Sequence, residues 1–206
     1  MNRRKRYDVR TLTQLALLVA VEMVMKPIGL GSVPVGPLYM SFLTVPIAVG
    51  AIVLGPLAGM ILGGVFGFVS FLDAVKGASV MTSNLLAVSP VHTFVLCFGT
   101  RVLMGVCVGF VYLAMSKLCR NSAVNCFVTS LCAPMLNTLF FMGYIVLAFY
   151  QTEYIQSLVS SKGASSPFMF VVLLVGVQGV VEAVVCSITG TAIAGGVKKA
   201  LKRSAG

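Results

Sequence analysis

Polar and charged side chains interrupt several long apolar stretches of the chain, and they are the residues best able to do chemistry. They are Arg101, Asn137, Thr138, Gln178 and Glu182. A charge at the centre of a membrane helix costs about 2.5–3.5 kcal/mol on insertion scales, so such a side chain faces the bundle interior and is a functional candidate by default. Gln178 and Glu182 are four residues apart and share a helix face. We expect these groups to form a polar pocket for a small molecule. A purely structural Arg101–Glu182 ion pair is the alternative.

Further candidates lie towards the ends of the apolar stretches. Glu22 and Lys26 are four residues apart near the outer end of the first stretch, and a local ion pair along one helix explains them. His92 is the only histidine, and without a Cys or carboxylate at ligand spacing it does not indicate a metal site. We include His92, Asn84 and Tyr144 among the candidate substrate-binding residues on the outer side.

Catalytic signatures are absent from the sequence. It contains no HExxH, GxSxG or Walker A motif, no paired carboxylates, and no CxxC or Cys/His pair at metal-binding spacing. The six cysteines are interpreted as small buried apolar residues. We expect neither an enzyme nor a bound metal or cofactor, and any energy input must come from ions or partner subunits.

The amino-acid composition indicates the class of protein in which these polar residues lie. Of the 206 residues, 58% are hydrophobic and only 10% are charged, where about 25% charged is usual for a soluble domain. Too few charges remain to cover a water-soluble globule. The net charge of +10 does not indicate nucleic-acid binding, because no soluble domain is available to carry a basic face. The sequence predicts an all-α membrane protein.

Six apolar stretches are long enough to be membrane spans. They cover residues 11–28, 38–54, 56–72, 91–115, 124–149 and 168–197. Basic residues gather in the N-terminal segment 1–10, at Lys117 and Arg120, and in the C-terminal segment 198–206. Because positive charge marks the cytoplasmic side, we predict one bundle over 1–206 with six transmembrane helices and both termini cytoplasmic. The longer connections, at 29–37, 73–90 and 150–167, are predicted to be outside, either as ordered binding loops or as slack links.

Small residues recur at every fourth position in two of the stretches. The third stretch carries Gly55, Gly59, Gly63 and Gly67, and the first carries Ala16 and Ala20. Such faces allow close helix approach. We predict helix packing for the glycines, and we interpret the alanine pair as a weak indication of a docking face for another membrane protein.

In order and spacing, the whole chain resembles the substrate-binding S components of energy-coupling factor (ECF) vitamin transporters, and most closely the pantothenate-type group. The similar segments are Ala16-Leu-Leu-Val-Ala20, Val33-Pro-Val-Gly-Pro37-Leu, Ala51-Ile-Val-Leu-Gly-Pro56, Gly63-Gly-Val-Phe-Gly67-Phe-Val-Ser70-Phe, Arg101-Val-Leu-Met-Gly105, Leu136-Asn-Thr138 and Gln178-Gly-Val-Val-Glu182-Ala. No single segment is specific.

The resemblance implies an ABC-type importer in a bacterial cell membrane. The S component would bind a water-soluble vitamin from outside and deliver it through a membrane coupling protein and two cytoplasmic ATPases. Ala16 and Ala20 match the face that docks the coupling protein in the family, and the five intramembrane polar residues match its substrate site. The chain departs from the family at Thr100, where Pro is usual, and at Gln178, where Asn is usual.

These departures leave the substrate open. Arg101 suits the carboxylate of an anion such as pantothenate, whereas an Arg101 already neutralised by Glu182 suits a neutral ring such as pyridoxine. Phe141 and Tyr144 are expected to pack against either ligand. Other classes remain as alternatives: an autonomous secondary transporter, for which no internal repeat is evident, an intramembrane enzyme using His92, and a purely structural subunit.

Overall fold

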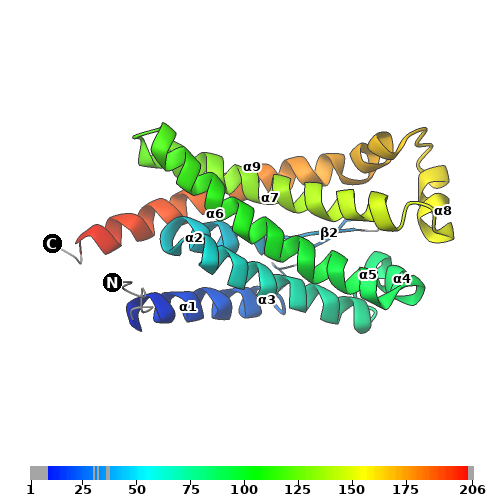
Figure 1. Cartoon of the computed structure of the whole chain (residues 1–206), viewed down its shortest axis with the longest axis horizontal. Helices are drawn as coiled ribbons and strands as arrows, with labels where there is room; N and C mark the ends of the chain where they lie inside the picture. Colours follow the sequence, from blue (N-terminus) through cyan, green and yellow to red (C-terminus); the bar gives the residue numbers. More distant parts are fainter. Residues whose placement is uncertain (1–8, 30, 32, 36–37, 204–206) are drawn as a thin grey trace, which may run out of the picture.

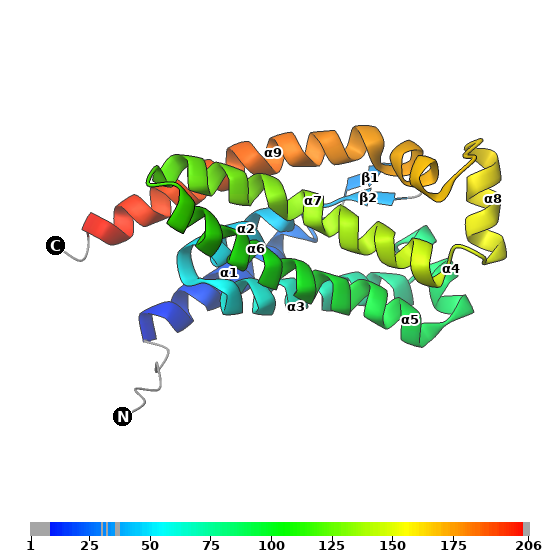
Figure 2. The same ribbon diagram turned by 45° about the horizontal axis from the view of Figure 1, so that its top comes forward.

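The computed structural model describes residues 9–29, 31, 33–35 and 38–203. Its helices are α1 (Val9–Met25), α2 (Thr44–Leu54), α3 (Pro56–Val75), α4 (Val80–Val88), α5 (Pro90–Phe94), the π-helix η1 (Val95–Gly99), α6 (Thr100–Leu118), α7 (Ser122–Ala148), α8 (Glu153–Ser161) and α9 (Pro167–Arg203). A short antiparallel hairpin joins β1 (Val33–Val35) to β2 (Leu38–Met40). Long helices run side by side along the molecule, as Figures 1 and 2 show.

Four helical stretches within the described residues are long and apolar enough to cross a membrane: Pro56–Val75, Pro90–Leu118, Ser122–Ala148 and Pro167–Leu201. Helix α1 has 17 residues and α2 has 11. At 1.5 Å per residue α2 is about 16 Å long, well short of a bilayer core. The predicted span 38–54 is wrong as a single helix, because its first residues form β2 and a turn. The count of six spans stays a prediction.

Glycines hold α3 and α6 in close contact. A Cβ on Gly59 would meet the carbonyl oxygen of Gly105, a Cβ on Gly63 would meet that of Arg101, and a Cβ on Gly67 would lie 2.7 Å from the Cα of Phe98. Because the obstructing atoms are backbone, neither helix can yield locally. The predicted packing role is thus supported by the geometry at Gly59, Gly63 and Gly67.

Gly55 has a different role, and the packing prediction is wrong for it. It lies between α2 and α3 with φ of 100°, and a Cβ there would meet no atom within 4 Å. This backbone conformation strongly favours glycine. Gly55 therefore makes the sharp turn that lets Pro56 begin α3.

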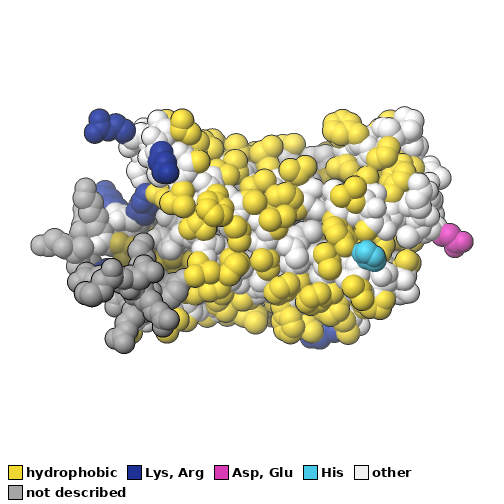
Figure 3. Space-filling model, in the orientation of Figure 1, with side chains coloured by type: hydrophobic (Ala, Val, Ile, Leu, Met, Phe, Trp, Pro, Cys, Tyr) yellow, Lys and Arg dark blue, Asp and Glu magenta, His cyan; other side chains and the backbone are white. Residues whose placement is uncertain are grey.

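The two ends of the molecule differ. The start of α1, the end of α9 and the α6–α7 connection lie at one end, and most of the Lys and Arg side chains visible in Figure 3 gather there. The hairpin, α4 and α8 lie towards the other end, so the described parts of the three long connections contain helices or strands. Apolar side chains cover the surface between the ends, as expected of a face in contact with lipid (Figure 3).

Candidate substrate site

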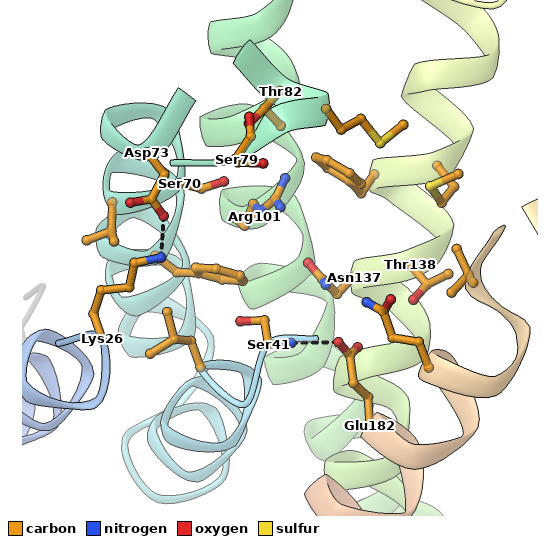
Figure 4. A pocket seen from close by; sticks show the side chains of 18 residues that line it. Lys26, Ser41, Ser70, Asp73, Ser79, Thr82, Arg101, Asn137, Thr138 and Glu182 are labelled. Carbon is orange, nitrogen blue, oxygen red and sulfur yellow. Dashed lines mark hydrogen bonds and ion pairs between the residues drawn. The ribbon is translucent and has the colours of Figure 1, made fainter. Parts of the chain in front are cut away.

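A cavity lies between the helices towards the end that carries α4 (Figure 4). Five of the predicted site residues line it together: Arg101, Asn137, Thr138, Gln178 and Glu182. Other described residues that line it are Lys26, Ser41, Leu43, Phe66, Val69, Ser70, Asp73, Ser79, Met81, Thr82, Phe141, Met142 and Val175. Helices α3, α6, α7 and α9 form its walls, while Ser79, Met81 and Thr82 are contributed by the start of α4 and the residue before it.

Arg101 is the buried cation of this cavity, with only 6% of its surface exposed. Its Nη1 donates to the Leu96 carbonyl at 2.9 Å and to Thr100 Oγ1 at 3.3 Å. Its guanidinium carbon lies 4.1 Å from the ring centroid of Phe141 and 5.1 Å from that of Phe66. Among the described residues, Nε has no hydrogen-bond partner and no carboxylate lies within ion-pair distance of the guanidinium.

The π-helix before Arg101 explains how the side chain is held. In η1 the backbone N–H of Thr100 bonds to the Val95 carbonyl, five residues earlier. The Leu96 carbonyl instead accepts the Thr100 hydroxyl at 2.5 Å as well as Arg101 Nη1. Single-turn π-helices inside α-helices occur frequently at functional sites. The wider turn and the Thr100 hydroxyl together orient the guanidinium.

Glu182 lies on another wall of the cavity and does not pair with Arg101. Its Oε1 accepts the backbone N–H of Ser41 at 2.6 Å, and Ser41 Oγ donates to the Gly31 carbonyl at 3.0 Å. The structural Arg101–Glu182 ion pair considered from the sequence is therefore wrong for this structure. Glu182 instead bonds to the chain at the base of the hairpin, and Arg101 has no carboxylate within ion-pair distance among the described residues.

Lys26 forms its ion pair with Asp73, at the ends of α1 and α3 (Figure 4). The predicted local Glu22–Lys26 pair is wrong, because Lys26 reaches across to the neighbouring helix. Sequence reasoning missed Lys26 and Asp73 as cavity residues, as it missed Ser41 and Ser70. The only available signal was that Asp73 and Lys26 both end apolar stretches on the same predicted side of the membrane.

The remaining predicted binding residues lie apart from this lining. Asn84 is exposed on α4, and its amide donates to the Val80 carbonyl at 2.8 Å. His92 is exposed, and its Nδ1 lies 2.9 Å from the Tyr144 hydroxyl. The His92 ring also packs edge-on against Phe149, with 6.1 Å between the ring centroids. The structure does not bring Asn84, His92 or Tyr144 to the cavity surface.

The structure also gives the positions of Gln178, Ala16 and Ala20, whose predicted roles stay predictions. Gln178 is buried beside the cavity, and its Oε1 has no partner among the described residues. Ala16 and Ala20 are exposed on one side of α1. An unpartnered amide oxygen suits a ligand donor, and an exposed small-residue face suits a helix partner.

Fold and cavity together define a multi-pass helical membrane protein with a polar site buried near one end. Residues 10–193 match the family model of the ECF transporter, substrate-specific component. The chain belongs to this family, which confirms the resemblance to ECF S components; the pantothenate-type group stays a prediction. Members are binding subunits of transporters rather than enzymes; they bind small molecules and work with a membrane component and ATPases. No curated protein matches the chain.

Proposed function

We propose that the chain captures pantothenate, or a vitamin of the same carboxylate chemistry, from the outer side of a bacterial cell membrane. It then delivers the vitamin through a coupling protein and two cytoplasmic ATPases. In this proposal both termini are cytoplasmic, and Ala16 and Ala20 dock the coupling protein. Residues 1–8, which hold Arg3, Arg4, Lys5 and Arg6 of the predicted N-terminal basic cluster, lie outside the described residues.

The observation that carries the proposal is the buried guanidinium of Arg101, which has no carboxylate within ion-pair distance among the described residues. A buried charge without a counter-ion is costly, and a carboxylate ligand removes that cost through charge-assisted hydrogen bonds. Nε, which has no partner among the described residues, is available for such a bond. The rings of Phe66 and Phe141 shield the contact from water, which strengthens it.

The rest of the cavity supports a ligand that also carries hydroxyl and amide groups. Asn137, Thr138 and Gln178 offer neutral donors and acceptors, and Glu182 offers an acceptor. Pantothenate has a carboxylate, an amide and two hydroxyl groups. The separation of Arg101 from Glu182 argues against a neutral ligand such as pyridoxine, since that alternative needed the two charges to cancel.

Equilibrium binding to the purified protein in detergent tests the proposal. Isothermal titration should show binding of pantothenate and weaker binding of pantothenol, which has the same skeleton but an alcohol in place of the carboxylate. Pyridoxine serves as the neutral competitor. Equal affinity for pantothenate and pantothenol would reject the carboxylate contact, and tight binding of pyridoxine alone would replace the proposed substrate.

A further inference from the structure

Lys26 connects the cavity to the helix that carries the proposed docking face. It follows directly after α1, lines the cavity, and forms its ion pair with Asp73 near the end of α3 (Figure 4). About a quarter of the Lys26 side chain and a fifth of the Asp73 side chain are exposed, 26% and 20%. The ion pair therefore closes the α1–α3 edge of the cavity at a place that water reaches.

A second acceptor for Lys26 lies one helical turn away. Glu22 lies in the last turn of α1, four residues before Lys26, which directly follows the helix. At this spacing the two side chains are close enough to interact. Glu22 is only 2% exposed, and neither carboxyl oxygen has a partner among the described residues. A buried polar group without a partner is costly. An ammonium that moved to Glu22 would satisfy this buried group, while Asp73, which is 20% exposed, could be hydrated in its place.

Hydrogen bonds connect the end of α1 to the substrate site, so a movement of Lys26 would affect that site. The Gly31 N–H donates to the Met25 carbonyl at 2.8 Å, and the Gly31 carbonyl accepts from Ser41 Oγ at 3.0 Å. Ser41 in turn donates its backbone N–H to Glu182 at 2.6 Å. A continuous series of hydrogen bonds therefore joins the end of α1 to a cavity wall on α9.

We propose that Lys26 is a positioning residue that exchanges between Asp73 and Glu22, and that this exchange opens the α1–α3 edge and sets the rate of ligand release. The release step rests on the proposed function. With Lys26 on Asp73 the cavity is closed. With Lys26 on Glu22, Asp73 is hydrated, the edge is open, and the end of α1 is no longer held to α3.

A ligand-free experiment tests the exchange itself. Thermal unfolding in detergent is measured for Lys26→Met, Glu22→Leu and their combination, in the wild-type and Asp73→Asn backgrounds. In the wild-type background the two substitutions should shift the melting temperature additively, because Lys26 is held by Asp73. In the Asp73→Asn background they should become non-additive, because Lys26 then bonds to Glu22. Additive shifts in both backgrounds would overturn the exchange.

The rate of ligand release tests the proposed effect of this exchange on the cavity. Dissociation of radiolabelled pantothenate should be faster for Asp73→Asn and slower for Glu22→Leu, each by about two- to fivefold, the range expected for a partly exposed ion pair. Glu22→Gln retains an acceptor and should release faster than Glu22→Leu. Lys76→Met removes an exposed charge three residues from Asp73 and is the matched control, with an unchanged rate.

The unfolding and release experiments distinguish a failure of the exchange from a failure of the proposed substrate. Shifts of the release rate in the same direction for Asp73→Asn and Glu22→Leu, or no shift in either, would overturn the release role. Failure of the wild-type protein to bind pantothenate would count against the proposed substrate, and the unfolding experiment would then decide the exchange alone.

Discussion

At the scale of single residues, the strongest prediction concerns Arg101. Arg101→Gln removes the charge but keeps a polar side chain. Hydrogen bonds to charged groups contribute about 1.5–3 kcal/mol, so affinity for pantothenate should fall by roughly 10- to 150-fold. Affinity for pantothenol, which has no carboxylate, should change little. Titration of both ligands against both proteins measures this difference, and an equal loss for the two ligands would contradict a contact between Arg101 and a carboxylate.

Thr100 should have a smaller effect on the same contact. Its hydroxyl accepts from Arg101 Nη1 at 3.3 Å and donates to the Leu96 carbonyl at 2.5 Å. Thr100→Val keeps the shape and removes both bonds, each worth about 0.5–1.5 kcal/mol net. We expect pantothenate affinity to fall by less than it does for Arg101→Gln. Thr138→Val, which alters another hydroxyl of the lining, should weaken pantothenate and pantothenol equally. Wild-type affinity for Thr100→Val would show that η1 alone orients the guanidinium.

Residue chemistry also explains which site residues were predictable. A polar group inside an apolar helix has to face the interior, so Arg101, Asn137 and Glu182 could be assigned to one pocket without a structure. His92 lies where a helix begins, and there hydropathy does not say which way a side chain points. Lys26 had two carboxylates within reach, and only the approach of α1 to α3 determines that it pairs with Asp73.

At the scale of elements, the α3–α6 contact gives a prediction on stability. Gly63→Ala places a methyl group against the Arg101 carbonyl, so the helices must separate. Overpacking of this kind costs about 1–3 kcal/mol, and the melting temperature in detergent should fall. Gly143→Ala is the matched control, because Gly143 lies inside α7, near its C-terminal end, and a Cβ there meets nothing within 4 Å. That substitution should be neutral or slightly stabilising. Equal effects of the two changes would mean that the contact is loose.

The limits of sequence reasoning at this scale have a physical cause. Hydropathy locates apolar stretches but is blind to backbone hydrogen bonding, so it merged β2 and α2 into one span. It also gave no sign of the π-turn at Val95–Gly99, whose residues are apolar in any helix type. The fourfold glycine spacing predicted the close α3–α6 face correctly, yet it could not separate Gly55, whose positive φ depends on the turn before Pro56.

At the scale of the whole molecule, the cavity and the proposed docking face belong to different parts of the chain. The cavity lies towards the α4 end, whereas Ala16 and Ala20 are exposed on α1 and do not line it. Binding and uptake should therefore be separable. Vesicles that contain this chain alone should bind pantothenate without accumulating it, and accumulation should require the coupling protein, the two ATPases and ATP. Accumulation by the chain alone would favour an autonomous transporter.

The single substitution Ala16→Trp should separate vitamin binding from uptake. Small-residue faces act by letting two helices approach closely, and an indole ring on that face prevents the approach. Overpacking of about 1–3 kcal/mol corresponds to roughly a 5- to 150-fold weaker association. ATP-dependent uptake into vesicles that hold the complete transporter should fall accordingly, while pantothenate affinity in detergent stays at the wild-type value. The neighbouring Leu17 is 65% exposed and lies about 100° around α1 from Ala16, so Leu17→Trp is the control, with uptake retained. Loss of uptake in both variants would show that α1 tolerates no large ring in the membrane and would remove the support for a specific docking face. Normal uptake by Ala16→Trp would place the partner elsewhere on the molecule.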